Sequence, residues 1–149
     1  MNSKRRRIRL FLAVLVIGAI AFSSVLSFAA DDVTVYVNGK KVVSDVPATI
    51  VNSRAMLPFR AVFNALGVKD DAIIWHQNSK SIEVSSGGKY IFLAVGNSGA
   101  LVNDTLVSLD AAPYIKQSRT FVPIRFVSEA LGADVKWNAK TRVVTITKK

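Results

Sequence analysis

The sequence contains no cysteine and a single histidine, His76, among its 149 residues. The absence of cysteine excludes disulfides, thiol catalysis and cysteine-ligated metal sites. Copper and zinc sites need several nitrogen or sulfur ligands, which one imidazole cannot supply. We therefore expect a domain that is held together by packing alone and that uses no copper, no zinc and no other cofactor.

Arrangements typical of enzymes are lacking as well. The loop Gly96-Asn97-Ser98-Gly99 faintly resembles the nucleophile loop of serine proteases. A catalytic triad also needs an orienting carboxylate and an oxyanion hole, so a glycine-rich turn explains these residues better. The acidic pairs Asp31-Asp32 and Asp70-Asp71 lack the spacing of a calcium loop. We predict no catalytic residues and therefore no enzyme.

The first 30 residues have the three-part composition of a secretory signal peptide. Five basic residues lie before residue 10, an apolar run follows over Leu10–Phe22, and small residues fill Ser23–Ala30. This composition predicts a signal peptide over residues 1–29, with cleavage after Ala29 or Ala30. The alternative is an uncleaved membrane anchor, although the apolar run is short for the roughly 20 residues that span a bilayer.

Positive charge is concentrated in this leader. The whole chain carries 20 Lys and Arg against 10 Asp and Glu, and no acidic residue precedes Asp31. Without the five basic residues of the leader the balance is 15 against 10, a net charge of +5. The remaining basic residues are scattered, so nucleic-acid binding is not expected. A moderate positive charge is compatible with weak attraction to anionic polymers of the cell envelope.

The rest of the chain is organised around two similar segments. Arg54–Gly67 has the sequence RAMLPFRAVFNALG, and Arg119–Gly132 has the sequence RTFVPIRFVSEALG, 65 residues later. Each segment is followed by a tryptophan, Trp75 or Trp137, and there the offset falls to 62 residues. The first copy therefore carries three extra residues within 68–74.

Local patterns predict the elements of each copy. Val33–Val37 alternates in polarity, and the Asn38-Gly39 that follows is the strongest short signal for a β-hairpin. Pro58 fits the first helical position, apolar residues follow it at helical spacing, and Gly67 ends them, which together predict a helix of about nine residues. Such a helix is too short to be stable alone, so it must pack against a sheet.

The two copies together predict the fold class. Self-similarity over this length indicates one supersecondary unit used twice, here over residues 33–95 and 96–149. We predict an α+β domain over residues 30–149 that consists of two ββαββ repeats. The antiparallel sheets are expected to wrap around one short helix each.

The whole pattern resembles the stalk domain, which is also called the copper amine oxidase N-terminal-like domain. The residues that carry the resemblance occur in two ordered sets: Asn38, Gly39, Arg54, Leu57, Pro58, Arg60, Leu66, Gly67 and Trp75, then Asn103, Arg119, Val122, Pro123, Arg125, Leu131, Gly132 and Trp137. The resemblance covers residues 33–148. It implies an α+β domain with an antiparallel sheet around a helix, in an exported protein of Gram-positive bacteria with an extracellular or cell-wall setting.

Four arginines are candidate site residues. Arg60 and Arg125 lie in the first turns of the two predicted helices, and Arg54 and Arg119 lie four residues before the prolines. A cation is unfavourable at a helix N-terminus, so its occurrence in both copies suggests a specific acceptor. One interpretation is a structural clamp between helix and sheet. The other is a subsite that binds an anion or a partner through the planar guanidinium group.

Trp75 and Trp137 are the second set of candidates. Each follows an apolar residue two positions earlier, Ile73 or Val135, which favours a place in the core. Tryptophan is also largely buried in most proteins. The alternative is that the two indoles are platforms on which sugars stack.

These observations lead to one expected function and two alternatives. We expect a secreted, wall-associated, non-catalytic module that binds or acts as a spacer at the cell wall. Its partners would be polysaccharide, peptidoglycan or an envelope protein, and it would contact the membrane only through an uncleaved leader. The alternatives are a small secreted hydrolase with an unrecognised site and a membrane-anchored structural spacer.

Overall fold

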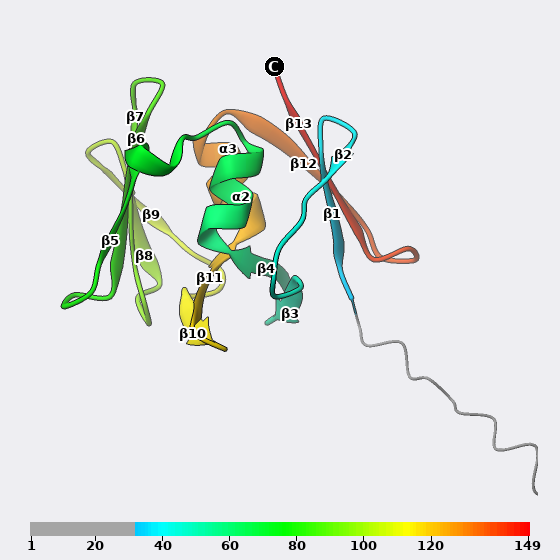
Figure 1. The fold of residues 1–149 in the computed structure, drawn as a ribbon, viewed down its shortest axis with the longest axis horizontal. Helices are drawn as coiled ribbons and strands as arrows, with labels where there is room; N and C mark the ends of the chain where they lie inside the picture. The colour runs from blue at the N-terminus through cyan, green and yellow to red at the C-terminus, as the bar shows by residue number, and fades with distance from the viewer. Residues whose placement is uncertain (1–31) are drawn as a thin grey trace, which may run out of the picture. The chain divides into compact units, whose positions relative to one another are not determined.

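The structure is a computed structural model that describes residues 32–149 (Figure 1). The predicted signal peptide over residues 1–29 lies outside this range. Within the described residues, no helix is both long enough and apolar enough to cross a membrane.

Short strands and two short α-helices alternate along the described chain. The first half contains β1 (Thr34–Val37), β2 (Lys40–Lys41), β3 (Thr49–Val51), β4 (Arg54–Pro58), α2 (Phe59–Ala65), the 3₁₀ turn η2 (Asp70–Ala72), β5 (Ile73–His76), β6 (Ser81–Ser86) and β7 (Lys89–Ala94). The second half contains β8 (Gly99–Val102), β9 (Thr105–Ser108), β10 (Tyr114–Lys116), β11 (Arg119–Pro123), α3 (Ile124–Ala130), β12 (Ala133–Asn138) and β13 (Val143–Lys148).

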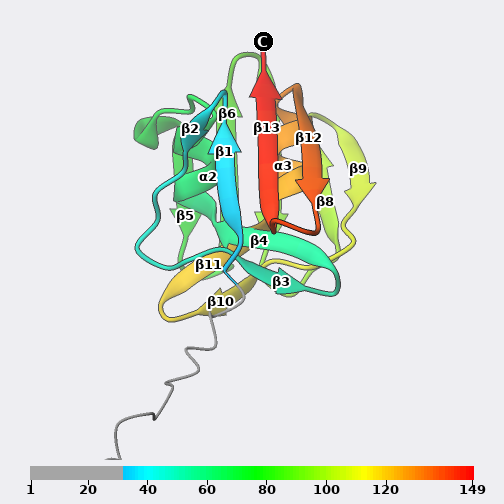
Figure 2. The ribbon, with the colours of Figure 1, turned by 90° about the vertical axis from the view of Figure 1, so that its right-hand side faces the viewer.

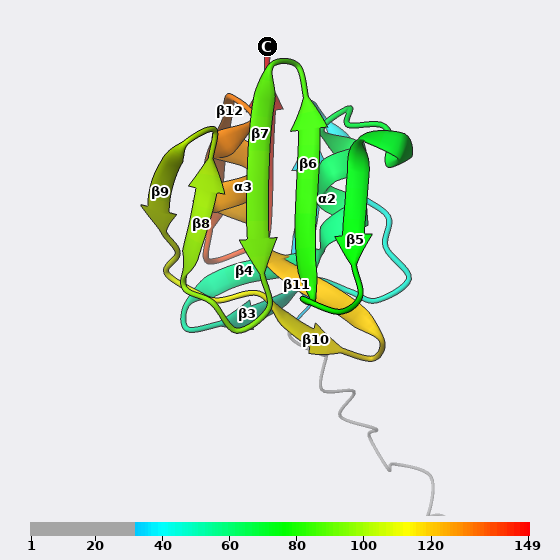
Figure 3. The ribbon, with the colours of Figure 1, turned by 90° about the vertical axis from the view of Figure 1, so that its left-hand side faces the viewer.

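The described strands form three sheets. Their orders are β12-β13-β1-β2, β10-β11-β4-β3 and β5-β6-β7-β8-β9. Neighbouring strands are antiparallel except for β1 and β13, which pair in parallel. Figure 2 faces the β12-β13-β1-β2 sheet and Figure 3 faces the five-stranded sheet, and α2 and α3 lie between these two sheets. The β10-β11-β4-β3 sheet lies at the ends of the helices where α2 and α3 begin (Figure 1).

Both helices end before a glycine, as the sequence predicts, but each has seven residues rather than nine, and Pro58 precedes α2 instead of occupying its predicted first helical position. Pro58 and Pro123 end the preceding strands, β4 and β11, and the helices start at the next residue. Gly67 and Gly132 then have φ angles of 84° and 79°, the left-handed conformation that terminates helices and that glycine adopts without strain.

Burial holds these short helices in place. The main apolar cluster joins both helices to the two flanking sheets, and its largest side chains include Phe63, Ile82, Ile91, Leu93, Ile124 and Ile146. Burying one such side chain contributes roughly 1.5–3 kcal/mol. The helices therefore depend on the sheets around them rather than on their own hydrogen bonds.

The prediction of an α+β fold with mainly antiparallel sheets is confirmed. The sheets, however, do not follow the boundary between the two predicted repeats. The β1–β2 hairpin pairs with β12–β13, and β5–β6 joins β8–β9 through β7. In the third sheet β4 pairs with β11, with Leu57 opposite Val122. Each sheet thus combines strands from both predicted repeats, and the expectation of one sheet around each helix is corrected. The division into two repeats stays a prediction.

The extra residues of the first copy form a distinct feature. The chain makes the 3₁₀ turn η2 between Gly67 and β5, and both Asp70 and Asp71 lie in this turn. In the second copy β12 starts at Ala133, directly after Gly132. The connection from the helix to the following strand is therefore longer in the first copy than in the second.

Candidate binding clefts

Two clefts open where the helices begin. The first cleft, of about 700 Å³, lies between the start of α2, the end of β5, the β2–β3 connection and the β10–β11 turn. The second cleft, of about 420 Å³, lies between the start of α3, the end of β12, the β12–β13 connection and the β3–β4 turn. Their linings contain matching residues at the two sequence offsets: Pro58 and Pro123, Phe59 and Ile124, Arg60 and Arg125, Trp75 and Trp137, Ile115 and Ile50, and Arg119 and Arg54.

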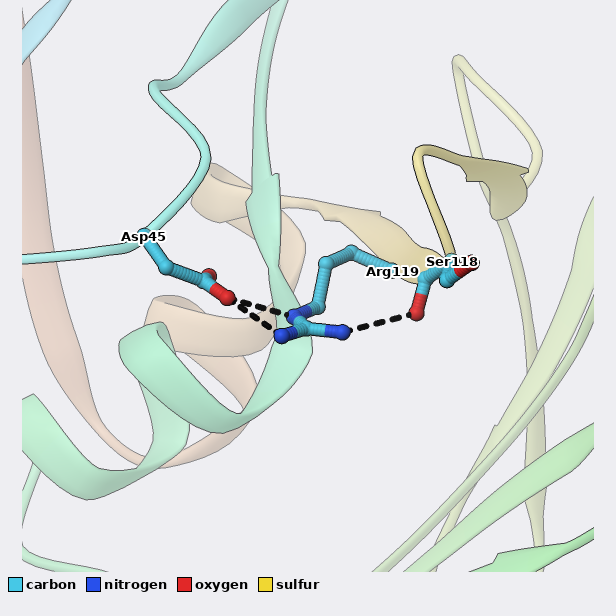
Figure 4. Close-up of polar contacts among 3 residues, drawn as sticks. All are labelled: Asp45, Ser118 and Arg119. Atoms are coloured by element: carbon cyan, nitrogen blue, oxygen red, sulfur yellow. Dashed lines mark hydrogen bonds and ion pairs between the residues drawn. The ribbon is translucent and has the colours of Figure 1, made fainter.

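In the first cleft, Arg119 is engaged through all three of its guanidinium nitrogens (Figure 4). Its Nε donates to Asp45 Oδ2 at 2.8 Å, its Nη2 donates to the same oxygen, and its Nη1 donates to the carbonyl oxygen of Ser118 at 3.1 Å. The hydrogen bond from Arg119, reinforced by its charge, lowers the pKa of Asp45 below the ordinary value of 3.8. Arg119 thus ties the β2–β3 connection to β11.

Arg60, in the first turn of α2, also has an acidic partner. Its Nη1 donates to Asp70 Oδ1 at 3.2 Å, and the amide of Asn64 donates to the same oxygen at 3.1 Å. The guanidinium carbon lies 5.2 Å from the centroid of the Phe59 ring, a distance at which cation–π attraction operates. The side chains of Arg60 and Asp70 are 48% and 70% exposed, so the pair contributes about 1 kcal/mol or less.

Trp75 is half-buried on the wall of the first cleft. Its ring stacks on Phe59, with centroids 6.1 Å apart and an interplanar angle of 29°. Its indole N–H donates to Gln77 Oε1 at 2.8 Å. One face of the indole and its only donor are therefore already occupied by the protein.

In the second cleft, Arg54 is held less completely than Arg119. Its Nε donates to Asp110 Oδ2 at 2.7 Å and its Nη1 donates to the carbonyl oxygen of Ser53 at 3.3 Å. Within residues 32–149, its Nη2 makes no hydrogen bond. Asp110 is not among the residues that line this cleft.

Arg125, the counterpart of Arg60, is exposed and has no hydrogen bond or ion pair with any described residue. Because Ala133 follows Gly132 directly, no turn equivalent to η2 brings a carboxylate to it. Glu129, one helical turn further along α3, is exposed and does not line the cleft. The acceptor that the sequence suggested for both helix-start arginines is thus present only for Arg60.

Trp137 is the more exposed of the two tryptophans. Its exposed fraction is 40%, and its ring is not stacked on another aromatic ring of the described residues. Arg142, from the β12–β13 connection, lines the same cleft. The core interpretation thus describes Trp75, which packs against the main apolar cluster, better than it describes Trp137.

The structure sorts the predicted arginines into two crossed sets. Arg60 shares the first cleft with Arg119, and Arg125 shares the second with Arg54, so each cleft takes one arginine from each predicted repeat. Sequence reasoning missed the carboxylates: Asp45 and Asp110 hold the two strand arginines, and Asp70 holds Arg60. A signal for the first two was present, because Asp45 and Asp110 are separated by the same 65 residues as their arginine partners.

The other chemical groups do not form an evident site. His76 Nε2 lies 3.0 Å from Glu83 Oε2 across the β5–β6 pair, and within residues 32–149 no hydrogen bond links this pair to Ser98. Within the same residues, no group of three or more histidine, cysteine, aspartate or glutamate side chains could hold a metal ion.

The model of the family described as the copper amine oxidase N-terminal domain matches residues 24–146. A protein of Brevibacillus choshinensis named "Protease inhibitor" is 27% identical over 135 residues, which are 91% of this chain and 40% of that protein. The chain thus spans well under half the length of this curated relative.

Proposed function

The chain belongs to the copper amine oxidase N-terminal domain family, and we propose that it is a non-catalytic, exported module that binds a component of the cell envelope. The family itself is non-catalytic. The basic leader and the net charge of +5 that remains without it support export and an anionic environment. The predicted alternatives of a small hydrolase and a membrane-anchored spacer stay predictions.

The observation that carries this proposal is the second cleft. An exposed arginine without a partner among residues 32–149, Arg125, lies beside a tryptophan that is 40% exposed, Trp137. Folding leaves the guanidinium group solvated and the indole incompletely covered, which offers both to a ligand. The cleft is framed by the Arg54–Asp110 ion pair, which joins β4 to the β9–β10 connection. Arg125 itself lies on α3 and Trp137 on β12, so both side chains extend from regular elements rather than from a loop.

The test is a sedimentation assay with purified cell walls. Protein expressed from the full-length gene is mixed with Gram-positive walls, before and after extraction of their teichoic acids, and the pelleted fraction is measured. We expect binding to the intact walls. Failure to bind either preparation would contradict the proposed function.

Secretion is tested on the same expressed protein. We expect the released form to begin near Ala30 or Asp31, as read by N-terminal sequencing or intact mass. A membrane-bound form with its original Met1 terminus would contradict cleavage and favour the anchored alternative.

A second candidate function comes from the name of the relative, "Protease inhibitor". Under this hypothesis the envelope component would be a secreted protease that the chain binds as a protein partner. The residual activity of a subtilisin-type and a thermolysin-type protease, measured with a tenfold molar excess of the purified protein, tests it. Full residual activity of both enzymes would leave wall binding as the only candidate.

A further inference from the structure

Three arginines and no acidic residue line the second cleft. The arginines are Arg54, Arg125 and Arg142, and the remaining lining is apolar or uncharged. On the basis of the proposed function, we propose that the second cleft binds an anionic saccharide unit. In this site the guanidinium groups of Arg125 and Arg54 bind a phosphate or carboxylate group, and the sugar ring packs against the indole of Trp137.

Two of these arginines have donors that no described residue satisfies. Arg125 makes no ion pair with any described residue, and the carboxylate that holds Arg54 uses its Nε and leaves Nη2 without a hydrogen bond in residues 32–149. Arginine presents a rigid fork of N–H donors that matches the oxygens of phosphate or carboxylate groups. An oxyanion in the cleft would supply the acceptors that these two side chains lack.

In the first cleft, by contrast, both matching arginines have acidic partners. There, Asp45 lines the cleft and accepts from Arg119, and Asp70 accepts from Arg60. Asp70 comes from the extra residues between Gly67 and Trp75, which the second copy does not have. The absence of a described carboxylate beside Arg125 is therefore a consequence of the shorter connection there.

Trp137 supplies the apolar half of the site. Its exposed fraction of 40%, without a stacked aromatic neighbour among the described residues, leaves ring surface uncovered. Large flat aromatic faces are effective binding surfaces because they offer much contact area at little cost in side-chain entropy. A volume of about 420 Å³ lies within the range of small-molecule sites and suits one short saccharide unit rather than a folded partner.

The binding test uses calorimetry with small probes and the full-length expressed protein. The probes are glucose 1-phosphate, glucuronate, glucose and inorganic phosphate, at low ionic strength because exposed charges are screened by salt. We expect a charged sugar to bind at least about tenfold more tightly than glucose and than inorganic phosphate. Preference for glucose 1-phosphate would assign phosphate-bearing units, and preference for glucuronate carboxylate-bearing units. The proposal would be overturned if glucose bound as tightly as the charged sugars. It would also be overturned if inorganic phosphate bound and neither charged sugar did.

Matched variants locate the site. Arg125→Gln is expected to weaken binding of the preferred probe at least about tenfold, equivalent to about 1.4 kcal/mol. Its melting temperature should stay unchanged, because Arg125 contacts no described acid. Arg60→Gln in the first cleft and Lys40→Gln on the exposed strand β2 each remove one positive charge as well, and both should bind normally. Equal weakening by all three variants would indicate net charge rather than a site and would overturn the proposal.

The wall assay separates this inference from the proposed function. If wild-type protein binds walls and Arg125→Gln does not, both the proposed function and the site in the second cleft are supported. If both proteins bind equally, the envelope function stands and the second cleft is not the site. If the wild-type protein does not bind walls but binds a charged sugar through Arg125, the assignment of the site to the second cleft is correct and the proposed function is wrong.

Discussion

The two clefts are built from matching positions, but their charges are balanced differently. In the first, Arg60 and Arg119 each face a carboxylate, from Asp70 and Asp45 respectively. In the second, Arg125 faces none among the described residues. The cause lies in the three additional residues that form η2, outside the matching segments. In a repeated sequence pattern, the shared residues identify the frame, and the places where the copies differ are the places to look for a binding site.

The largest expected effect concerns one pair of matching buried positions in the two helices. Phe63 of α2 is fully buried, and its counterpart in α3 is Ser128, whose hydroxyl donates to the carbonyl oxygen of Ile124 at 2.8 Å. Phe63→Ala should lower the free energy of unfolding by about 3–5 kcal/mol, because it leaves a cavity. Ser128→Ala should cost about 1 kcal/mol or less, since it removes one intrahelical hydrogen bond. Urea denaturation measures both, and equal losses would contradict this difference in packing.

An intermediate effect is expected from making the first cleft resemble the second. Asp70→Asn removes the carboxylate beside Arg60, so the first cleft should gain affinity for the charged sugar that the second binds. Calorimetry should then detect a second, weaker site, because Asp45 still occupies Arg119 and Phe59 still covers one face of Trp75; the loss of stability should be about 1 kcal/mol or less. Asp71→Asn, at the neighbouring exposed position of η2, is the matched control. The absence of a second site in Asp70→Asn would show that the carboxylate of Asp70 does not decide between the clefts.

The smallest expected effect depends on acid. The pKa of Asp45 is lowered when folded, by the hydrogen bond and charge of Arg119. The stability that this pair contributes is therefore present above the ordinary pKa of 3.8 and is lost as the pH falls through the lower folded value. Asp45→Asn should flatten the fall in melting temperature between about pH 4 and about pH 2. Asp104→Asn, in an exposed turn, is the control and should leave this fall unchanged. If the melting temperature of Asp45→Asn falls as steeply as that of the wild type, the pH dependence does not come from the Asp45–Arg119 pair.

Much of the frame could be predicted from the sequence. Local chemistry favours one conformation at the Asn38-Gly39 turn, at the prolines before both helices and at the glycines after them. The first hairpin and the two helices therefore lie close to their predicted positions. The pairing of strands could not be predicted in the same way. Whether β1 pairs with β13 or with a strand of its own copy depends on contacts between residues more than 100 positions apart, and local patterns carry no information on these.

The candidate site was predicted only in outline. The four arginines and two tryptophans were identifiable because their spacing repeats. Their roles depended on carboxylates that lie elsewhere in the chain, at Asp45, Asp70 and Asp110, and an exposed acid in a loop has no distinctive sequence pattern. The three extra residues near η2 were visible in the alignment of the two copies. The sequence alone did not show that the turn places Asp70 Oδ1 3.2 Å from Arg60 Nη1.

The central claim is that the second cleft, and not the first, binds the charged sugar. The chain offers one tryptophan in each cleft, Trp75 and Trp137. Fluorine NMR of protein labelled with 5-fluorotryptophan, with the two resonances assigned by Trp75→Phe and Trp137→Phe, reports on both clefts in one titration with the preferred charged sugar. The structure predicts that the Trp137 resonance shifts and saturates while the Trp75 resonance stays in place. A shift of Trp75 alone, or equal shifts of both, would contradict the claim.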